Sequence, residues 1–211
     1  MVKVGSQLFT AEGPRAVEKL AGLGFGIFLD LKFHDIPNTV AGAVRAAASL
    51  PEVRMMTLHA TGGVAMMEAA KNAAAGQSRP PALLGVTILT SLDEKSLEGI
   101  GIEGPASVRV FALAQLAKRA GLDGVVASAH EARNIRDKCG DNFLIVVPGV
   151  RPTQTSADDQ SRVAAPAEAI RAGADYLVVG RPITSAKNPR EAALAIAKEI
   201  GSAANTSSAQ A

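Results

Sequence analysis

Charged side chains interrupt an apolar stretch that otherwise has the composition of a buried strand. The stretch reads FLDLKFHDIP, from Phe28 to Pro37, and carries Asp30, Lys32 and Asp35. A lysine beside carboxylates in a partly buried place stays protonated, because nearby negative charge favours the charged form of the amine. Such an ammonium can stabilise developing negative charge and donate a proton. We therefore expect acid–base chemistry at Lys32.

The spacing of these residues predicts where their side chains point. Side chains alternate along a strand, so Asp30 and Lys32 share one side and the neighbouring leucines share the other. Asp35 follows three residues after Lys32, so the ammonium is expected to lie between two carboxylates. A purely structural ion pair is the alternative interpretation, because structural charge networks also perturb pKa values.

Glycine and arginine end two further apolar stretches, VVPGVR and VVGRPIT. Gly149 and Gly180 allow backbone amides to approach an anion, and the forked guanidinium groups of Arg151 and Arg181 match phosphate oxygens. A solvated surface charge is the alternative for either arginine alone. Two arginines in equivalent places favour a phosphorylated small molecule as the substrate.

Two connections near these ends are long. Residues 91–106 and 150–165 contain no obvious helix or strand, which favours binding loops or lids over simple connectors. Gln160 lies in the second connection and is a further candidate for phosphate binding, with a solvated polar residue as the alternative. Thr90 precedes the first and offers a hydroxyl, although a capping role fits it equally well.

Composition and charge narrow the class of protein. The chain has 211 residues, of which 47% are hydrophobic, and its 22 basic and 20 acidic residues leave a net charge of +2. So small a surplus does not indicate nucleic-acid binding. We find no apolar run that could span a bilayer and no signal-peptide pattern, and the single cysteine, Cys139, excludes an internal disulfide. A cytoplasmic protein is expected.

Short stretches rich in Val, Ile and Leu alternate with helical patterns, which is typical of βαβ units and a parallel sheet. Seven strands are predicted, at residues 2–5, 26–32, 55–60, 82–90, 124–128, 143–149 and 176–180. Their spacing of one strand–helix unit predicts an α/β fold of the (β/α)8 TIM-barrel type with the first strand missing. An open, doubly wound sheet is the rival fold, but no G-x-G-x-x-G follows the first strand.

One catalytic domain is expected over residues 1–201, with Gly201 ending the last helix. Residues 202–211 are small and polar, and we expect a disordered tail. In a barrel of this type the functional groups lie at the carboxyl ends of the strands, where the FLDLKFHDIP stretch and both arginine segments fall.

These motifs resemble those of the orotidine 5'-phosphate decarboxylases in their bacterial form. The resemblance covers nearly the whole chain through VKVG, FLDLKFHDIPNT, LHATGG, VTILTS, GLDGVVAS, PGVRP…DDQ and VVGRPIT. It implies decarboxylation of orotidine 5'-phosphate to UMP in pyrimidine biosynthesis, without cofactor or metal. Lys32 would deliver the proton to C6 of the pyrimidine.

The resemblance also implies roles for individual residues. A network of alternating charges would comprise Lys3, Asp30, Lys32 and Asp35. The active unit would be a homodimer. The residues that reach into the neighbouring subunit's site would be Asp35, Ile36 and Thr39. The phosphate would be held by Arg151, Gln160, Gly180 and Arg181, and the base would contact Thr90.

The chain departs from the family at its beginning. Members normally begin with a strand carrying an aspartate that contacts the ribose, whereas this sequence starts at the following strand, VKVG. Loss of a strand would leave unpaired sheet edges, so we expect the natural protein to be longer by about one strand–helix unit. At an open edge, Lys3 is also interpretable as a charge that blocks strand pairing.

Two other functions remain open at this point. One is a related metal-dependent phosphosugar decarboxylase or aldolase that shares the D-x-K strand, although FHDIPNT and GRPIT speak against it. The other is an inactive, truncated barrel that only binds nucleotide. His34, His59 and His130 lack the spacing of metal ligands, so no metal site is expected.

Overall fold

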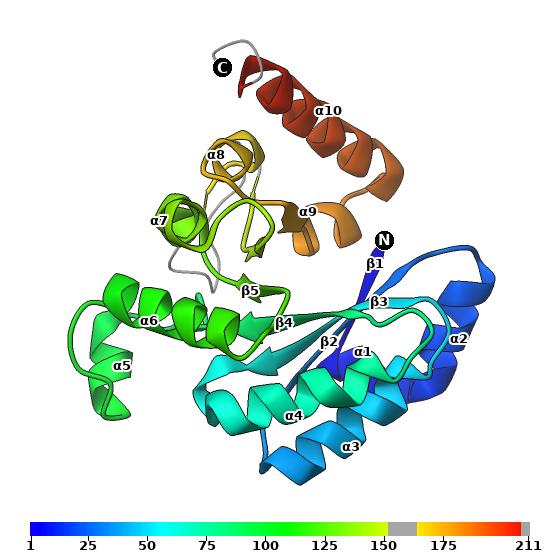
Figure 1. Cartoon of the computed structure of the whole chain (residues 1–211). Coiled ribbons are helices and arrows are strands. Elements are labelled where there is room, and N and C mark those ends of the chain that lie inside the picture. The colour runs from blue at the N-terminus through cyan, green and yellow to red at the C-terminus, as the bar shows by residue number, and fades with distance from the viewer. Residues whose placement is uncertain (152–163, 208–211) are drawn as a thin grey trace. The chain divides into compact units, whose positions relative to one another are not determined.

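The computed structural model describes residues 1–151 and 164–207, in which strands and helices alternate (Figure 1). The strands are β1 (Val2–Gly5), β2 (Ile27–Phe33), β3 (Val53–His59), β4 (Ala82–Val86), β5 (Gly124–Val126), β6 (Leu144–Pro148) and β7 (Tyr176–Val178). The α-helices are α1 (Ser6–Glu12), α2 (Pro14–Gly22), α3 (Pro37–Ala48), α4 (Gly63–Ala75), α5 (Glu94–Gly99), α6 (Ala106–Arg119), α7 (Ala129–Cys139), α8 (Pro166–Arg171), α9 (Arg181–Thr184) and α10 (Pro189–Ser207), with a 3-10 turn η1 (Ala60–Gly62) before α4. All seven predicted strands are present.

The chain divides into two compact units. The first comprises Met1–Thr87 and Ala112–Val125, and the second comprises Ile88–Phe111 and Val126–Ala211. In the first unit β1, β2, β3 and β4 are parallel and follow one another in chain order. In the second unit β6 and β7 are parallel neighbours. The prediction of a single domain over residues 1–201 stays a prediction.

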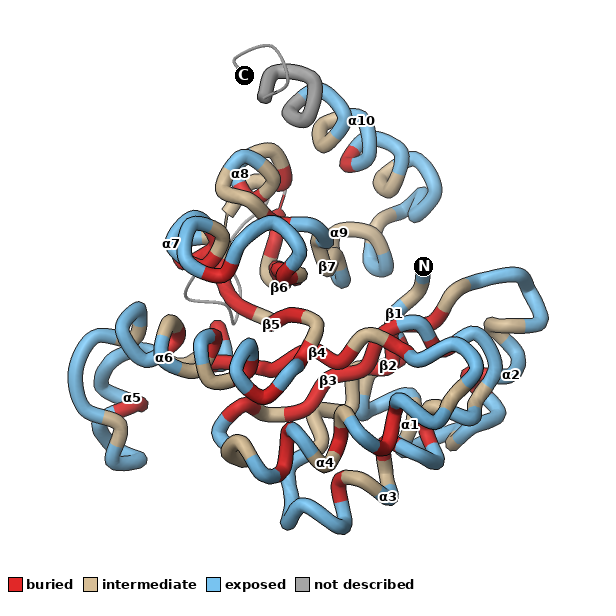
Figure 2. Tube along the Cα trace, viewed as in Figure 1, coloured by how far each residue is buried: buried red, intermediate tan, exposed pale blue. Residues whose placement is uncertain are grey.

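The core of the first unit lies between its strands and helices α1 to α4, which cover one face of the strands (Figures 1 and 2). Helix α3 begins with Pro37, a residue suited to the first turn because its missing N–H would have no helical partner. Val40, Val44 and Ala47 recur at helical spacing on its buried face. Fully buried apolar side chains of these strands include Val4, Ile27, Leu29, Met56, Leu58, Leu83 and Leu84.

Two aspartates stabilise the starts of strands by the same pattern of contacts. In the first unit the Leu83 amide donates to Asp123 Oδ2 over 2.8 Å, and the Asp123 amide donates to the Leu83 carbonyl over 3.0 Å. Lys71 Nζ completes the site at 2.6 Å from Asp123 Oδ1. For both aspartates, a left-handed glycine follows the end of the preceding helix and lies two residues before the aspartate, where a side chain would be strained.

The second copy of this pattern lies within the second unit. Asp175 Oδ2 accepts from the Ile145 amide over 2.7 Å and from Arg136 Nη2 over 2.6 Å. The Asp175 amide donates to the Ile145 carbonyl over 2.9 Å. The segments AGLD (120–123) and AGAD (172–175) therefore have the same structural role. In each, the aspartate links the start of its strand to the preceding strand and to a helix.

Two sequence predictions about element boundaries are wrong. Helix α10 continues through Gly201 to Ser207, because a glycine within a helix costs only about 1 kcal/mol relative to alanine and alanines follow it. The connection over residues 91–106 contains α5, which Asp93 caps by accepting from the Ser96 amide over 2.8 Å and which buries Leu97. Residues 208–211 lie outside the described residues.

We expect Asp123→Ala to lower the free energy of unfolding by about 2 kcal/mol, because it leaves the buried Leu83 amide without an acceptor. Asp123→Asn keeps an acceptor oxygen and loses the Lys71 ion pair, so its loss is expected to be below about 1 kcal/mol. Urea unfolding followed by circular dichroism measures both. Equal losses in the two variants would contradict a role for the backbone contact.

Candidate active site

Three charged side chains meet at the ends of β1 and β2, where the sequence predicted the chemistry. Lys32 Nζ lies 2.7 Å from Asp30 Oδ1, and Lys3 Nζ lies 3.2 Å from Asp30 Oδ2. The Asp30 side chain is 12% exposed, whereas about a third of each lysine side chain is exposed. Asp30 and Lys32 thus form a close pair, and Lys3 of the neighbouring strand joins them.

The backbone of β2 is irregular where these side chains project. Leu29 pairs with Met56 and Phe33 pairs with Leu58, so four steps along β2 match two steps along β3. Lys32 adopts the left-handed conformation with φ 53°, which costs a residue with a side chain about 1 kcal/mol or more. A regular alternation is therefore not the reason that Asp30 and Lys32 meet. Their ion pair forms across a bulge in β2.

The surroundings of Asp30 favour its ionised form. Burial raises the pKa of its carboxyl group, but the hydrogen bond and charge of Lys32, the charge of Lys3 and a hydrogen bond from Thr57 together lower the pKa below its usual value. The carboxylate therefore stays charged at neutral pH. The cluster of Lys3, Asp30 and Lys32, which we call the charge network, carries one net positive charge.

Asp35 does not join this network within the chain, in contrast to the prediction. Its Oδ1 accepts from the Ile36 amide over 2.6 Å, and the structure shows no ion pair for it among the described residues. The strand has ended at Phe33, and α3 begins at Pro37, so the Asp35 side chain is directed by the turn between them. Within one chain, a carboxylate lies between two lysines instead of a lysine between two carboxylates.

The turn that carries Asp35 is exposed. Ile36 is 66% exposed, and Asp35 and Thr39 are exposed beside it. The three residues that the resemblance assigned to a neighbouring subunit thus share one surface segment, at the start of α3.

Two histidines follow the same strand ends. The rings of His34 and His59 lie 5.3 Å apart between centroids and are tilted by 36°. Burial lowers the pKa of His59, and the charges of His34 and Lys32 lower it further, so His59 is neutral at pH 7. A neutral imidazole near Lys32 adds no further repulsion to the charge network.

Thr57 is a member of the site that the sequence analysis missed. It is fully buried on β3, and its hydroxyl contacts both Lys32 and Asp30. The available signal was a single hydroxyl residue within the apolar run MMTLHA. Its partners lie 27 and 25 residues earlier, so only the pairing of β2 with β3 brings them together.

The residues predicted to bind phosphate and base belong to the second unit. Arg151 and Thr90 are each 8% exposed, and the Arg151 amide donates to the Ala164 carbonyl over 3.1 Å. Gly180 precedes α9, and Arg181 is the first residue of that helix and is exposed. Gln160 lies outside the described residues. The roles of these residues stay predictions.

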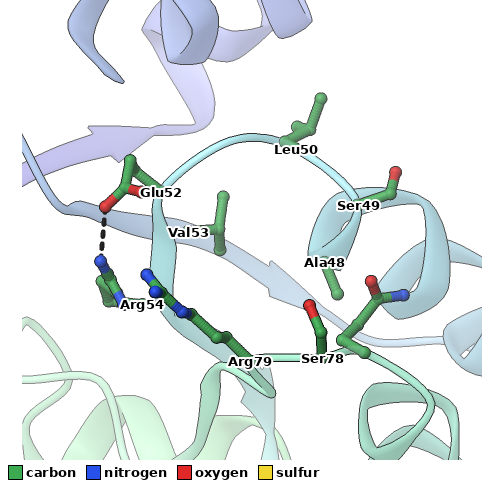
Figure 3. Close-up of a pocket in the computed structure, with 9 residues that line it drawn as sticks. Ala48, Ser49, Leu50, Glu52, Val53, Arg54, Ser78 and Arg79 are labelled. Atoms are coloured by element: carbon green, nitrogen blue, oxygen red, sulfur yellow. Dashed lines mark hydrogen bonds and ion pairs between the residues drawn. The ribbon is translucent and has the colours of Figure 1, made fainter. Parts of the chain in front are cut away.

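A polar pocket lies at the opposite end of β3 from the charge network. It has a volume of ≈ 190 Å³ and is lined by residues after α3, at the start of β3 and after α4. Arg79 extends along this pocket toward Arg54, which forms an ion pair of 2.5 Å with Glu52 (Figure 3). Val53, the first residue of β3, is one of the residues that line the pocket. None of the lining residues belongs to the predicted site.

The residues that the structure describes contain no group of three or more His, Cys, Asp and Glu side chains arranged to hold a metal ion. None of the helices in those residues is long and apolar enough to cross a membrane. Cys139 is buried.

Parallel strands alternating with helices, with lysines and an aspartate at the strand ends, define an α/β enzyme of the (β/α)8-barrel class, of which seven strands are described here. Residues 1–196 match the model of the orotidine 5'-phosphate decarboxylase / HUMPS family. The chain belongs to this family.

Individual relatives agree with this assignment. An orotidine 5'-phosphate decarboxylase of Geobacter sp. (strain M21) is 54% identical over 204 residues, covering 95% of this chain and 85% of the relative. That of Alcanivorax borkumensis is 52% identical over 190 residues, covering 90% and 82% of the two chains. A crystal structure of the decarboxylase from Lactobacillus acidophilus, 41% identical, has a TM-score of 0.83 and covers 95% of this chain and 86% of its own. The predicted fold class and family are confirmed.

The lowered pKa of Asp30 predicts a pH dependence of stability. A carboxyl group with a pKa below its ordinary value of 3.8 stabilises the folded state above that pH, and the contribution is lost as the pH falls through the lower folded-state pKa. The free energy of unfolding of Asp30→Asn should therefore fall less than that of the parent between pH 5 and the acid limit of folding.

Chemical unfolding at a series of pH values measures this difference. Glu18→Gln, which changes an exposed carboxylate on α2, serves as the control and should follow the parent curve. An Asp30→Asn curve parallel to the parent would contradict the inferred ionisation of Asp30.

Proposed function

We propose that this chain is a cytoplasmic, homodimeric enzyme that decarboxylates orotidine 5'-phosphate to UMP, with Lys32 delivering the proton to C6. The reaction follows from family membership, and the roles of residues are our proposal. The observation that carries it is the ion pair of 2.7 Å between Lys32 Nζ and Asp30, which fixes an ammonium at the end of β2.

The charge network suits the electrostatics of this reaction. Loss of CO₂ leaves negative charge on a ring carbon, and a preorganised cation beside that carbon lowers the barrier. Lys32 supplies the cation and then the proton, and Lys3 keeps the network positive when Asp30 is ionised. The Asp30 carboxylate repels the carboxylate of the bound substrate, and the departure of CO₂ relieves this repulsion.

A homodimer would complete the site. The proposal assigns Asp35, Ile36 and Thr39 to the partner's active site, where Asp35 would be the second acidic neighbour of the partner's lysine. Two facts support it: Asp35 has no ion pair among the described residues of its own chain, and Ile36 is 66% exposed. Burial of Ile36 in an interface would remove a large apolar side chain from water.

Phosphate binding is assigned to Arg151, Gln160, Gly180 and Arg181, and contact with the base to Thr90. Arginine at the start of a helix, next to a glycine that exposes the backbone amide, suits a phosphate at Gly180 and Arg181. Binding energy from the phosphate, a part of the substrate that does not react, can stabilise the ordered site in which Lys32 acts.

Replacement of the proton donor tests the central assignment. We expect Lys32→Ala to lower kcat by about 10²- to 10⁴-fold, because it removes both the cation and the proton. The loss of absorbance on conversion of orotidine 5'-phosphate to UMP measures the rate, with EDTA present to exclude a metal-dependent reaction.

The control for this variant is Lys19→Ala, which removes an exposed lysine of α2 and should leave kcat unchanged. Calorimetric binding of UMP to Lys32→Ala separates lost chemistry from lost binding. A Lys32→Ala protein with parental kcat would refute the assignment, and a parent that binds UMP without turning over substrate would support the nucleotide-binding alternative.

Mixing two inactive variants tests the shared site. Lys32→Ala and Asp35→Ala place their defects in the same site of a hybrid dimer, so the hybrid's other site is intact. After random exchange half of the dimers are hybrids, and we expect about a quarter of the parental activity. Activity that stays at the level of the separate variants, although sedimentation shows mixed dimers, would contradict sharing.

A further inference from the structure

The hydroxyl of Thr57 links the two halves of the charge network. Thr57 lies within β3 and is 0% exposed. Its Oγ1 accepts a hydrogen bond of 2.9 Å from the Lys32 amide and donates one of 2.9 Å to Asp30 Oδ1. The same Asp30 oxygen accepts from Lys32 Nζ over 2.7 Å. Thr57, Asp30 and Lys32 thus form a closed ring of three hydrogen bonds.

The hydrogen bond from the Lys32 amide to the Thr57 hydroxyl supplies an acceptor that the backbone lacks. The ladder between β2 and β3 is interrupted between the pairs Leu29–Met56 and Phe33–Leu58, so the Lys32 amide has no regular ladder partner. A partly buried amide without an acceptor would cost about 1–3 kcal/mol. Thr57 provides that acceptor at the residue whose φ of 53° is left-handed. The hydroxyl therefore stabilises the conformation that directs the Lys32 side chain.

The second bond fixes the carboxylate. Asp30 Oδ2 faces Lys3 over 3.2 Å, and Oδ1 faces both Lys32 and the Thr57 hydroxyl. A carboxylate held by two flexible lysines alone can rotate as either lysine moves. A buried threonine has a restricted χ1 and cannot follow such movements. Thr57 therefore sets the plane of the carboxylate to which the proton donor is bound.

We propose that Thr57 is a positioning residue for the decarboxylation, holding the Lys32 backbone and the Asp30 carboxylate in the one arrangement that places the Lys32 ammonium for proton transfer. This inference rests on the proposed function of Lys32. The other buried residues of β3 beside Thr57 are apolar, namely Met55, Met56 and Leu58. None of them can replace the hydroxyl.

The decisive variant is Thr57→Val, which keeps the branched shape and removes both hydrogen bonds. We expect kcat to fall by about 10- to 100-fold, because a displacement of about 1 Å in a reacting group has effects of this size. KM should change less than about threefold, because Thr57 holds the network and does not bind substrate. Thr57→Ser keeps the hydroxyl and should retain kcat within about threefold of the parent.

A control variant separates positioning from packing. Leu58→Val removes one methylene from the neighbouring buried position of β3 without touching a hydroxyl, and it should lower stability with little change in kcat. Urea unfolding confirms that all variants are folded. An equal loss of kcat in Thr57→Ser and Thr57→Val, or in Leu58→Val and Thr57→Val, would overturn the proposal in favour of packing.

A second measurement needs no turnover. The Thr57 hydroxyl is one of the groups that lower the pKa of Asp30, so the Asp30 pKa should rise in Thr57→Val and stay near the parental value in Thr57→Ser. Carbon NMR of the Asp30 carboxyl group measures it. An unchanged Asp30 pKa in Thr57→Val would overturn the proposed contact. An inactive parent would refute the proposed function, while this titration would still decide whether Thr57 holds the network.

Discussion

The attraction between one carboxylate and two ammonium groups holds the functional end of the first unit together. Lys3 and Lys32 would repel each other at these distances without Asp30 between them. The carboxylate is largely buried, which strengthens both attractions and makes its charge costly without them. Each of the three groups therefore depends on the other two, and one positive charge is left over for an anionic substrate.

The backbone conformation of Lys32 also depends on the contacts around it. Lys32 occupies a left-handed conformation at a bulge, where β2 loses its regular pairing with β3. Strain of this kind persists only where the surrounding contacts determine it, and here those contacts are the ion pair to Asp30 and the hydrogen bond to Thr57. A conformation that costs energy is thus found at the residue to which we assign the chemistry.

The aspartates elsewhere in the fold show how different this use of a carboxylate is. Asp123 and Asp175 each bind one cation and one backbone amide, so their charge and the strand start are both satisfied. Their contacts stabilise the fold and leave no surplus charge. Asp30 instead binds two cations and a hydroxyl, which leaves the cluster positive and keeps ammonium groups partly exposed.

The exposed turn before α3 contains residues that contribute little to the stability of a single chain. Ile36 lies in water and Asp35 bonds only to the neighbouring amide among the described contacts, which contributes little to the stability of a single chain. In the proposed homodimer, the partner subunit would cover Ile36 and contact Asp35. The segment then serves the partner's site, while α3 behind it packs into the core of its own chain through Val40 and Val44.

Much of the fold and part of the site could be predicted from the sequence, because periodicity and composition are local. The seven apolar runs marked the strands, and the charges of Asp30 and Lys32 marked the strand end at which the charge network lies. The motif strings also identified the family. The errors at Gly201 and in the 91–106 connection arose where local signals were weak, at a tolerated helix glycine and at a short helix capped by Asp93.

Only the tertiary structure decided which groups surround the two residues of the D-x-K motif. Register between strands brought Thr57 to Asp30 and Lys32 from 25 to 27 residues away, and the bulge in β2 turned the Lys32 backbone left-handed. The contact of Asp35 with the Ile36 amide was likewise set by the turn into α3. Alternation along a single strand contains no information on its neighbour's register, so these contacts could not be obtained from the residue pattern.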